Sequence, residues 1–119
     1  MKRLSKAEIL AAADLATEVV EVPEWGGSVT VRTMTGADRD AFEAALVRVV
    51  DGKREPDLTN MRAKLVALTV VDEAGERLFD AADVDALARK SAAALDRVAA
   101  AAQRINGIGA EAAEETAKN

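Results

Sequence analysis

The sequence has 119 residues, enough for one domain with a modest core, and its 16 Lys and Arg against 21 Asp and Glu give a formal net charge of −5. It has no His and no Cys, which excludes imidazole and thiolate catalysis, disulfides and the usual zinc sites. Because these residue types are missing, we expect a non-enzymatic protein with no catalytic residue, cofactor or metal site. The acidic balance also argues against a nucleic-acid binder.

The amino-terminal segment 5–14 has the pattern of a short helix. Ser5 and Glu8 have the spacing of a capping box, and Ile9 and Leu10 supply a small apolar face. We expect a brief helix, or a mobile arm that orders on binding a partner. No apolar region typical of a signal peptide follows the basic start, and no apolar run approaches the roughly 18 residues of a membrane span. We therefore expect a cytoplasmic protein that does not enter membranes.

Residues 17–34 contain two β-branched, alternating runs joined by Pro23-Glu24-Trp25-Gly26-Gly27. Two such runs around a turn rich in Gly and Pro predict a β-hairpin. The alternation places Val29 and Val31 on one face. Because a two-stranded hairpin alone is marginal in water, this face must pack on helices, on another strand or on a second copy.

Two features of this hairpin leave alternatives open. Trp25, the only Trp, either folds back over the helical core or anchors an interface from an exposed turn, and both roles are compatible if a neighbouring subunit completes the core. The free edge of the hairpin either recruits a strand from a partner or is protected by the charges of Glu18, Glu21 and Arg32.

The next segment has helical periodicity. Thr35 is a candidate N-cap, and Phe42 belongs to an apolar series at three- and four-residue steps that predicts a helix over 37–50. Asp51-Gly52 would end this helix, with Gly52 in the left-handed conformation. Residues 53–56 then form a charged linker.

Further helices are expected over 57–70, after Asp80 as N-cap, and over 91–106, with a turn at 72–76 and a short extended piece at 77–79. Asn106-Gly107 should stop the last helix. Alanines account for 27 residues and predict firm helices that approach closely around a thin core. The predicted fold is therefore a single α+β domain over 1–119, mostly helical. It has the hairpin, a bundle of about four helices within 36–106, and an acidic tail at 110–119.

Other clusters do not form recognisable chemical motifs. The acids between Asp72 and Asp85 lack the spacing of a calcium loop, and Asp80 and Asp83 are better explained as a cap and a helix-dipole partner. The glycines at 26–27 and 107–109 lack a phosphate-loop pattern. Basic residues surround the linker between Arg48 and Lys64, but the acids and the proline among them argue against a helix-turn-helix.

Several stretches resemble the tail assembly chaperones of long-tailed bacteriophages and prophages, and the likeness runs from about residue 5 to 117. The stretches are Glu21-Val22-Pro23-Glu24-Trp25-Gly26-Gly27, Val29-Thr30-Val31-Arg32, Thr35-Gly36-Ala37-Asp38-Arg39-Asp40-Ala41-Phe42-Glu43, Arg62-Ala63-Lys64-Leu65-Val66-Ala67-Leu68, Val71-Asp72-Glu73-Ala74-Gly75-Glu76-Arg77-Leu78-Phe79 and Ser91-Ala92-Ala93-Ala94-Leu95-Asp96-Arg97-Val98. They are packing and turn patterns, of which the Pro-Glu-Trp-Gly-Gly turn is the most distinctive.

The resemblance implies a non-enzymatic assembly factor in the host cytoplasm that is absent from the mature virion. Its implied partners are the tape measure protein, which it keeps soluble, and the major tail tube protein, which it recruits. A longer form made by ribosomal frameshifting near the end of the frame is known in many such families. Self-association is expected because the alanine-rich faces and the lone hairpin need neighbours, and we expect it to strengthen on the tape measure protein.

The residues that we single out for protein interaction are Pro23, Trp25, Gly26, Gly27 and the core anchor Phe42. Two other functions remain as alternatives at this point. One is a structural tail or connector component that stays in the virion, and the other is a small cytoplasmic DNA-binding regulator.

Overall fold

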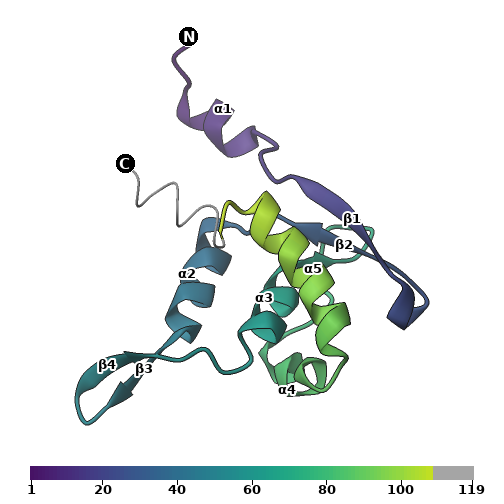
Figure 1. Cartoon of the computed structure of the whole chain (residues 1–119). Helices are drawn as coiled ribbons and strands as arrows, with labels where there is room; N and C mark the ends of the chain where they lie inside the picture. Colours follow the sequence, from purple (N-terminus) through teal and green to yellow (C-terminus); the bar gives the residue numbers. More distant parts are fainter. Residues whose placement is uncertain (109–119) are drawn as a thin grey trace, which may run out of the picture.

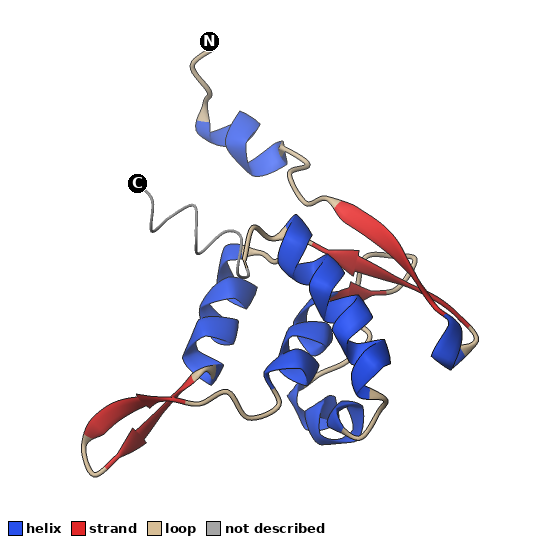
Figure 2. Ribbon diagram, viewed as in Figure 1, coloured by secondary structure: helices blue, strands red, loops and turns tan. Residues whose placement is uncertain are grey.

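A computed structural model describes residues 1–108 of the chain. Figure 1 and Figure 2 show a small sheet covered on one face by helices, with a second hairpin and the amino-terminal helix extending away from this body. The elements are α1 (Lys6–Ala11), β1 (Thr17–Val22), the 3₁₀ turn η1 (Pro23–Trp25), β2 (Gly27–Arg32), α2 (Gly36–Ala45), β3 (Val47–Val50), β4 (Lys53–Pro56), α3 (Met61–Thr69), β5 (Val70–Val71), η2 (Ala81–Asp83), α4 (Val84–Ala88) and α5 (Ala92–Ile105). The α+β class predicted from the sequence is confirmed.

The main sheet has the strand order β1-β2-β5, and both pairings are antiparallel. The predicted amino-terminal hairpin is confirmed, with Thr17 opposite Arg32 and Val22 opposite Gly27. Val22 and Val31 are fully buried on the helix-facing side. Gly26 ends the turn at a φ of +74°, a conformation that side chains disfavour.

The predicted helix over 37–50 is wrong over its last five residues. The helix α2 ends at Ala45, and residues 47–50 instead form β3, which pairs with β4 as a second hairpin. Its turn is Asp51-Gly52, with φ values of +51° and +76°. Two central residues at positive φ give the tight turn that Asp-Gly favours between strands, so Gly52 is a hairpin residue rather than a helix stop. The predicted linker 53–56 is the strand β4.

The helix expected over 57–70 begins later and is followed by a strand. Asp57 accepts a hydrogen bond from the backbone N–H of Thr59 at 3.0 Å, which holds a turn before α3 begins at Met61. The β-branched pair Val70-Val71 then leaves the helix and pairs with β2 as β5. The extended piece predicted at 77–79 is reduced to one bridge between Arg77 and Val71.

The remaining helices begin where the sequence predicted. Asp80 caps η2, which continues into α4, and Ser91 caps α5 by accepting from the N–H of Ala94. Asn106 follows the last helical residue, as expected. The predicted acidic tail at 110–119 lies outside the described residues. Within residues 1–108, no helix has the length and apolar character needed to cross a membrane.

The core is thin and rich in alanine. The helices α3 and α5 pack against each other and over the sheet, and alanines fill much of their contact. Ala94 and Ala102 are fully buried in α5, and Ala63 is almost fully buried in α3. Because a methyl group occupies so little space, the helices approach closely, and few large side chains are wholly enclosed.

Candidate functional site

The turn η1, which contains the predicted interaction residues Pro23 and Trp25, is attached to α5 by an ion pair, and so is the strand β1 before it. The Arg97 guanidinium of α5 donates a hydrogen bond to the Glu24 carboxylate, and Arg104 binds Glu18 of β1 in the same way. A backbone hydrogen bond, together with Arg97, holds the pKa of Glu24 below its usual value. The amino-terminal hairpin is thus fixed to α5 at both ends of β1.

The structure places the five predicted interaction residues in two different environments. Pro23, Gly26 and Gly27 are exposed at the turn, whereas Trp25 is half-buried and packs against the core. The structure agrees with the interpretation in which the Trp25 ring covers the core. The exposed part of the ring remains accessible to a partner. Phe42 is only 6% exposed, which fits a core anchor. Contact of these residues with a partner stays a prediction.

A cleft that the sequence did not indicate lies where α3, α4 and α5 meet. It encloses about 390 Å³, and its apolar walls are formed by Leu58, Met61, Ala63, Ala88, Ala92 and Leu95. Three of these residues are alanines on three different helices, so the cleft exists because the side chains there are short. Leu58 is 64% exposed, and Arg62, Lys90 and Asn60 supply the polar part of the lining. We call this feature the alanine cleft.

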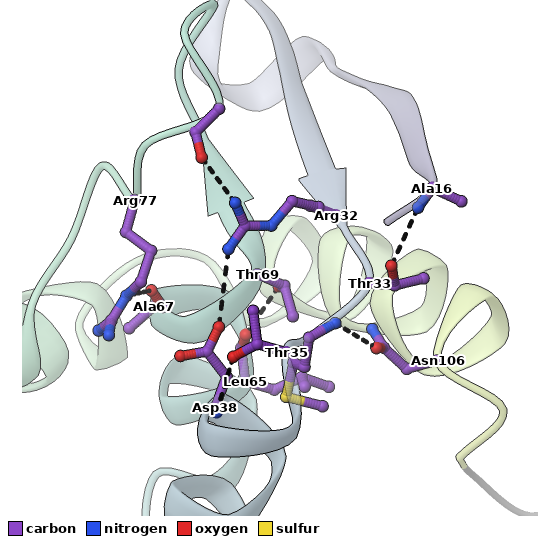
Figure 3. A network of polar contacts seen from close by, with 12 residues as sticks. Ala16, Arg32, Thr33, Thr35, Asp38, Leu65, Ala67, Thr69, Arg77 and Asn106 are labelled. Carbon is purple, nitrogen blue, oxygen red and sulfur yellow. Dashed lines mark hydrogen bonds and ion pairs between the residues drawn. The ribbon is translucent and has the colours of Figure 1, made fainter. Parts of the chain in front are cut away.

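A polar network joins the end of β2 to α2 and α5 (Figure 3). Asn106 Oδ1 accepts from the backbone N–H of Met34 at 2.7 Å, and its Nδ2 donates to the carbonyl of Ala102 at 2.8 Å. Arg32 donates to the carbonyl of Gly75 at 2.7 Å and faces Asp38 at 3.6 Å. The sequence indicated Asn106 only as a helix stop, because its long-range partner at Met34 has no local signal.

Replacement of Asn106 by alanine should lower the free energy of unfolding by about 1–2 kcal/mol, because the half-buried N–H of Met34 would lose its acceptor. Urea denaturation of the two proteins measures this difference. Glu73, an exposed polar residue of the turn at 72–76, offers the control Glu73→Ala, which should change the stability by less than about 0.5 kcal/mol. Equal losses in both variants would contradict a bracing role for Asn106.

Within residues 1–108, no group of three or more acidic side chains is arranged to hold a metal ion. Asp80 acts as the predicted cap by accepting from the N–H of Ala82, and Asp72 holds the predicted turn by accepting from the N–H groups of Ala74 and Glu76. The exposed apolar residues of the arm, the second hairpin and the alanine cleft are therefore the features that a function has to explain.

Comparisons with known proteins gave matches in sequence and in structure. A family model described as phage tail assembly chaperone matches residues 5–119. Among solved structures, the bacteriophage HK97 tail assembly chaperone matches with a TM-score of 0.58 and 17% identity, over 82% of this chain and 94% of that chain. At this identity the likeness shows a shared fold. Among curated proteins, no sequence matches the chain.

Proposed function

Because the chain belongs to the phage tail assembly chaperone family, we propose that it binds the tape measure protein and promotes assembly of the tail tube around it. The family match over 5–119 is the observation that carries this proposal. The proposed partners are the tape measure protein and the major tail tube protein, and the proposed place of action is the host cytoplasm before the virion is complete. The proposed role requires no catalysis.

The alanine cleft is the place that we propose for a helical segment of the tape measure protein. Its short alanine side chains leave a recess of about 390 Å³ that a large apolar side chain can fill. Leu58, 64% exposed beside it, offers further apolar surface to the same partner. A helix that inserts one or two large side chains into such a recess would be held mainly by burial of apolar area.

The proposed site is tested by filling the cleft from within. Ala92→Phe places a ring in the recess, and we expect it to weaken binding to the tape measure protein by about tenfold or more, equivalent to about 1.4 kcal/mol. The measurement is titration calorimetry with the purified partner. Ala100→Phe is the matched control, since Ala100 is exposed on the same helix and does not line the cleft. Equal affinity of the two variants would exclude the cleft.

The family role itself has a separate test. Mass spectrometry of purified virions should detect tail tube subunits and the tape measure protein but not this chain. Its presence at a stoichiometry comparable with other minor tail proteins would contradict the proposed function and support a structural component.

A further inference from the structure

The polar lining of the alanine cleft contains basic residues and no acidic residue. The cleft lies where α3, α4 and α5 come together in Figure 1, and its polar lining residues are Asn60, Arg62 and Lys90. No Asp or Glu is among the described residues that line it. Because the whole chain has 21 acidic against 16 basic residues, the cleft has the opposite sign of charge to the chain around it. A cleft lined by one sign of charge attracts a ligand of the other sign.

The two basic residues of this lining differ in their partners. The Arg62 guanidinium forms an ion pair with Asp96 of α5. Lys90 lies in the connection between α4 and α5, is exposed, and takes part in no ion pair within residues 1–108. The charge of Lys90 is therefore available to a molecule that enters the cleft.

The acidic residues beside the cleft already have partners in their own chain. Asp85 accepts a hydrogen bond from Asn60 Nδ2 at 3.4 Å, and Asp96 faces Arg62. Neither Asp85 nor Asp96 lines the cleft. The first residues of α3 do line it, and the partial positive charge of a helix amino end adds to the charge of Lys90. The cleft therefore suits an apolar side chain that has a carboxylate beside it.

A helical partner can present these two groups together. Side chains three or four residues apart lie on the same face of a helix, separated by about 5 Å along its axis. If a large apolar side chain fills the recess, the side chains one turn away lie at its rim, where the flexible stem of Lys90 can reach them. Because Lys90 is exposed, its charge affects partner choice and association rate more than the strength of binding.

We propose that Lys90 selects the segment that the alanine cleft receives, namely a helix with an acidic side chain three or four residues from its large apolar side chain. This inference rests on the proposed function, since it concerns the same cleft, and it adds the chemical class of the bound segment. The recess supplies apolar contact, and Lys90 binds the carboxylate. A helix with Lys or Arg in place of the acid is repelled, which separates it from a helix of equal apolar character.

Charge reversal at Lys90 tests this selection. Lys90→Glu should bind the intact tape measure protein about fivefold more weakly in about 0.1 M salt, whereas Lys90→Arg should stay within about twofold of the unaltered chain. In about 1 M salt the difference should fall below about twofold, because the Debye length shortens to about 3 Å. Titration calorimetry of the full chain measures these affinities. A loss caused only by a disturbed fold would remain at high salt.

Lys6→Glu is the matched control. It makes the same change of net charge at an exposed residue of α1, which lies away from the cleft in Figure 1. Lys6 also takes part in no ion pair within the described residues. Its affinity should stay within about twofold of the unaltered chain, and circular dichroism should show the same helix content for every variant. A loss at Lys6→Glu as large as that at Lys90→Glu would assign the effect to net charge and overturn the proposal.

Peptides of 20 residues that tile the tape measure protein identify the bound segment. Those that the unaltered chain binds should have an acid three or four residues from a large apolar residue. Replacement of that acid by Lys should weaken binding to the unaltered chain and strengthen binding to Lys90→Glu. Bound peptides without such an acid, or a Lys90→Glu variant that binds the intact protein like the unaltered chain, would overturn this inference and leave the proposed function standing. An unaltered chain that does not bind the intact protein would overturn both.

Discussion

Replacement of Leu65 by alanine is expected to lower the free energy of unfolding by about 3 kcal/mol, within the 2–5 kcal/mol typical of buried leucines. Leu65 is 1% exposed and is the largest side chain that is fully buried among the described residues. The buried cluster to which Leu65 belongs consists largely of alanines and valines, whose short side chains can fill little of the cavity. Because small domains have free energies of unfolding of about 5–15 kcal/mol, this substitution would remove a large part of the stability.

Chemical denaturation at 25 °C measures this loss, with Leu58→Ala as the matched control. Leu58 is 64% exposed and should change the stability by less than about 0.5 kcal/mol. A loss below about 1 kcal/mol at Leu65 would show that the surrounding chain collapses into the space. That result would contradict a thin core held by closely approaching alanine-rich helices.

Replacement of Trp25 by alanine is expected to cost about 2 kcal/mol of stability, roughly half the value for a fully buried Trp. The ring is half-buried against the core, and the ion pair between Glu24 and Arg97 holds the turn in place. Because Trp25 lies outside the α-helices, far-UV circular dichroism should remain close to that of the unaltered chain. If the exposed part of the ring also contacts a partner, affinity for the tape measure protein should fall more than the loss of folded protein explains.

Trp25→Phe is the control, since it keeps an aromatic cover over the core. It should restore most of the stability that Trp25→Ala loses. An unfolded Trp25→Ala protein would assign the residue to the core alone. Full stability with lost binding would assign it to the interface alone.

Much of the fold follows from local signals in the sequence. The capping box of Ser5 and Glu8 is present in α1, and the alternating valines around the Pro-Glu-Trp-Gly-Gly turn form the hairpin as predicted. Asp80 caps the helix that it was expected to cap, and the helix expected over 91–106 begins after Ser91. These features depend on residues close together in the chain, and their physical causes act within a few positions.

Two errors have a common cause in the valine-rich segments. Residues 47–50 continue the helical spacing of apolar residues. However, three of these four residues are valines, and the turn residues Asp51-Gly52 follow them. This combination favours a hairpin. Val70-Val71 leaves α3 because β2 offers an edge to pair with, and that edge is distant in the sequence. Periodicity alone does not separate a helix from a strand over so few residues.

The candidate site could be predicted from the sequence only in part. The turn residues were identified from their composition, but the alanine cleft depends on how Ala63, Ala88 and Ala92 come together from three helices. An alanine in the sequence gives no signal of a cleft, so the cleft could be found only from the packing of the helices. The free edges of β1 and β3 likewise became defined once the strand order was known.

The proposed chaperone role is tested most directly by the solubility of the tape measure protein from the same phage genome. We expect that protein to aggregate when expressed alone and to remain soluble, and to co-purify, when this chain is expressed with it. Ala92→Phe should reduce the soluble fraction, whereas Ala100→Phe should not. A tape measure protein that is equally soluble with and without this chain, and that does not co-purify with it, would contradict the account.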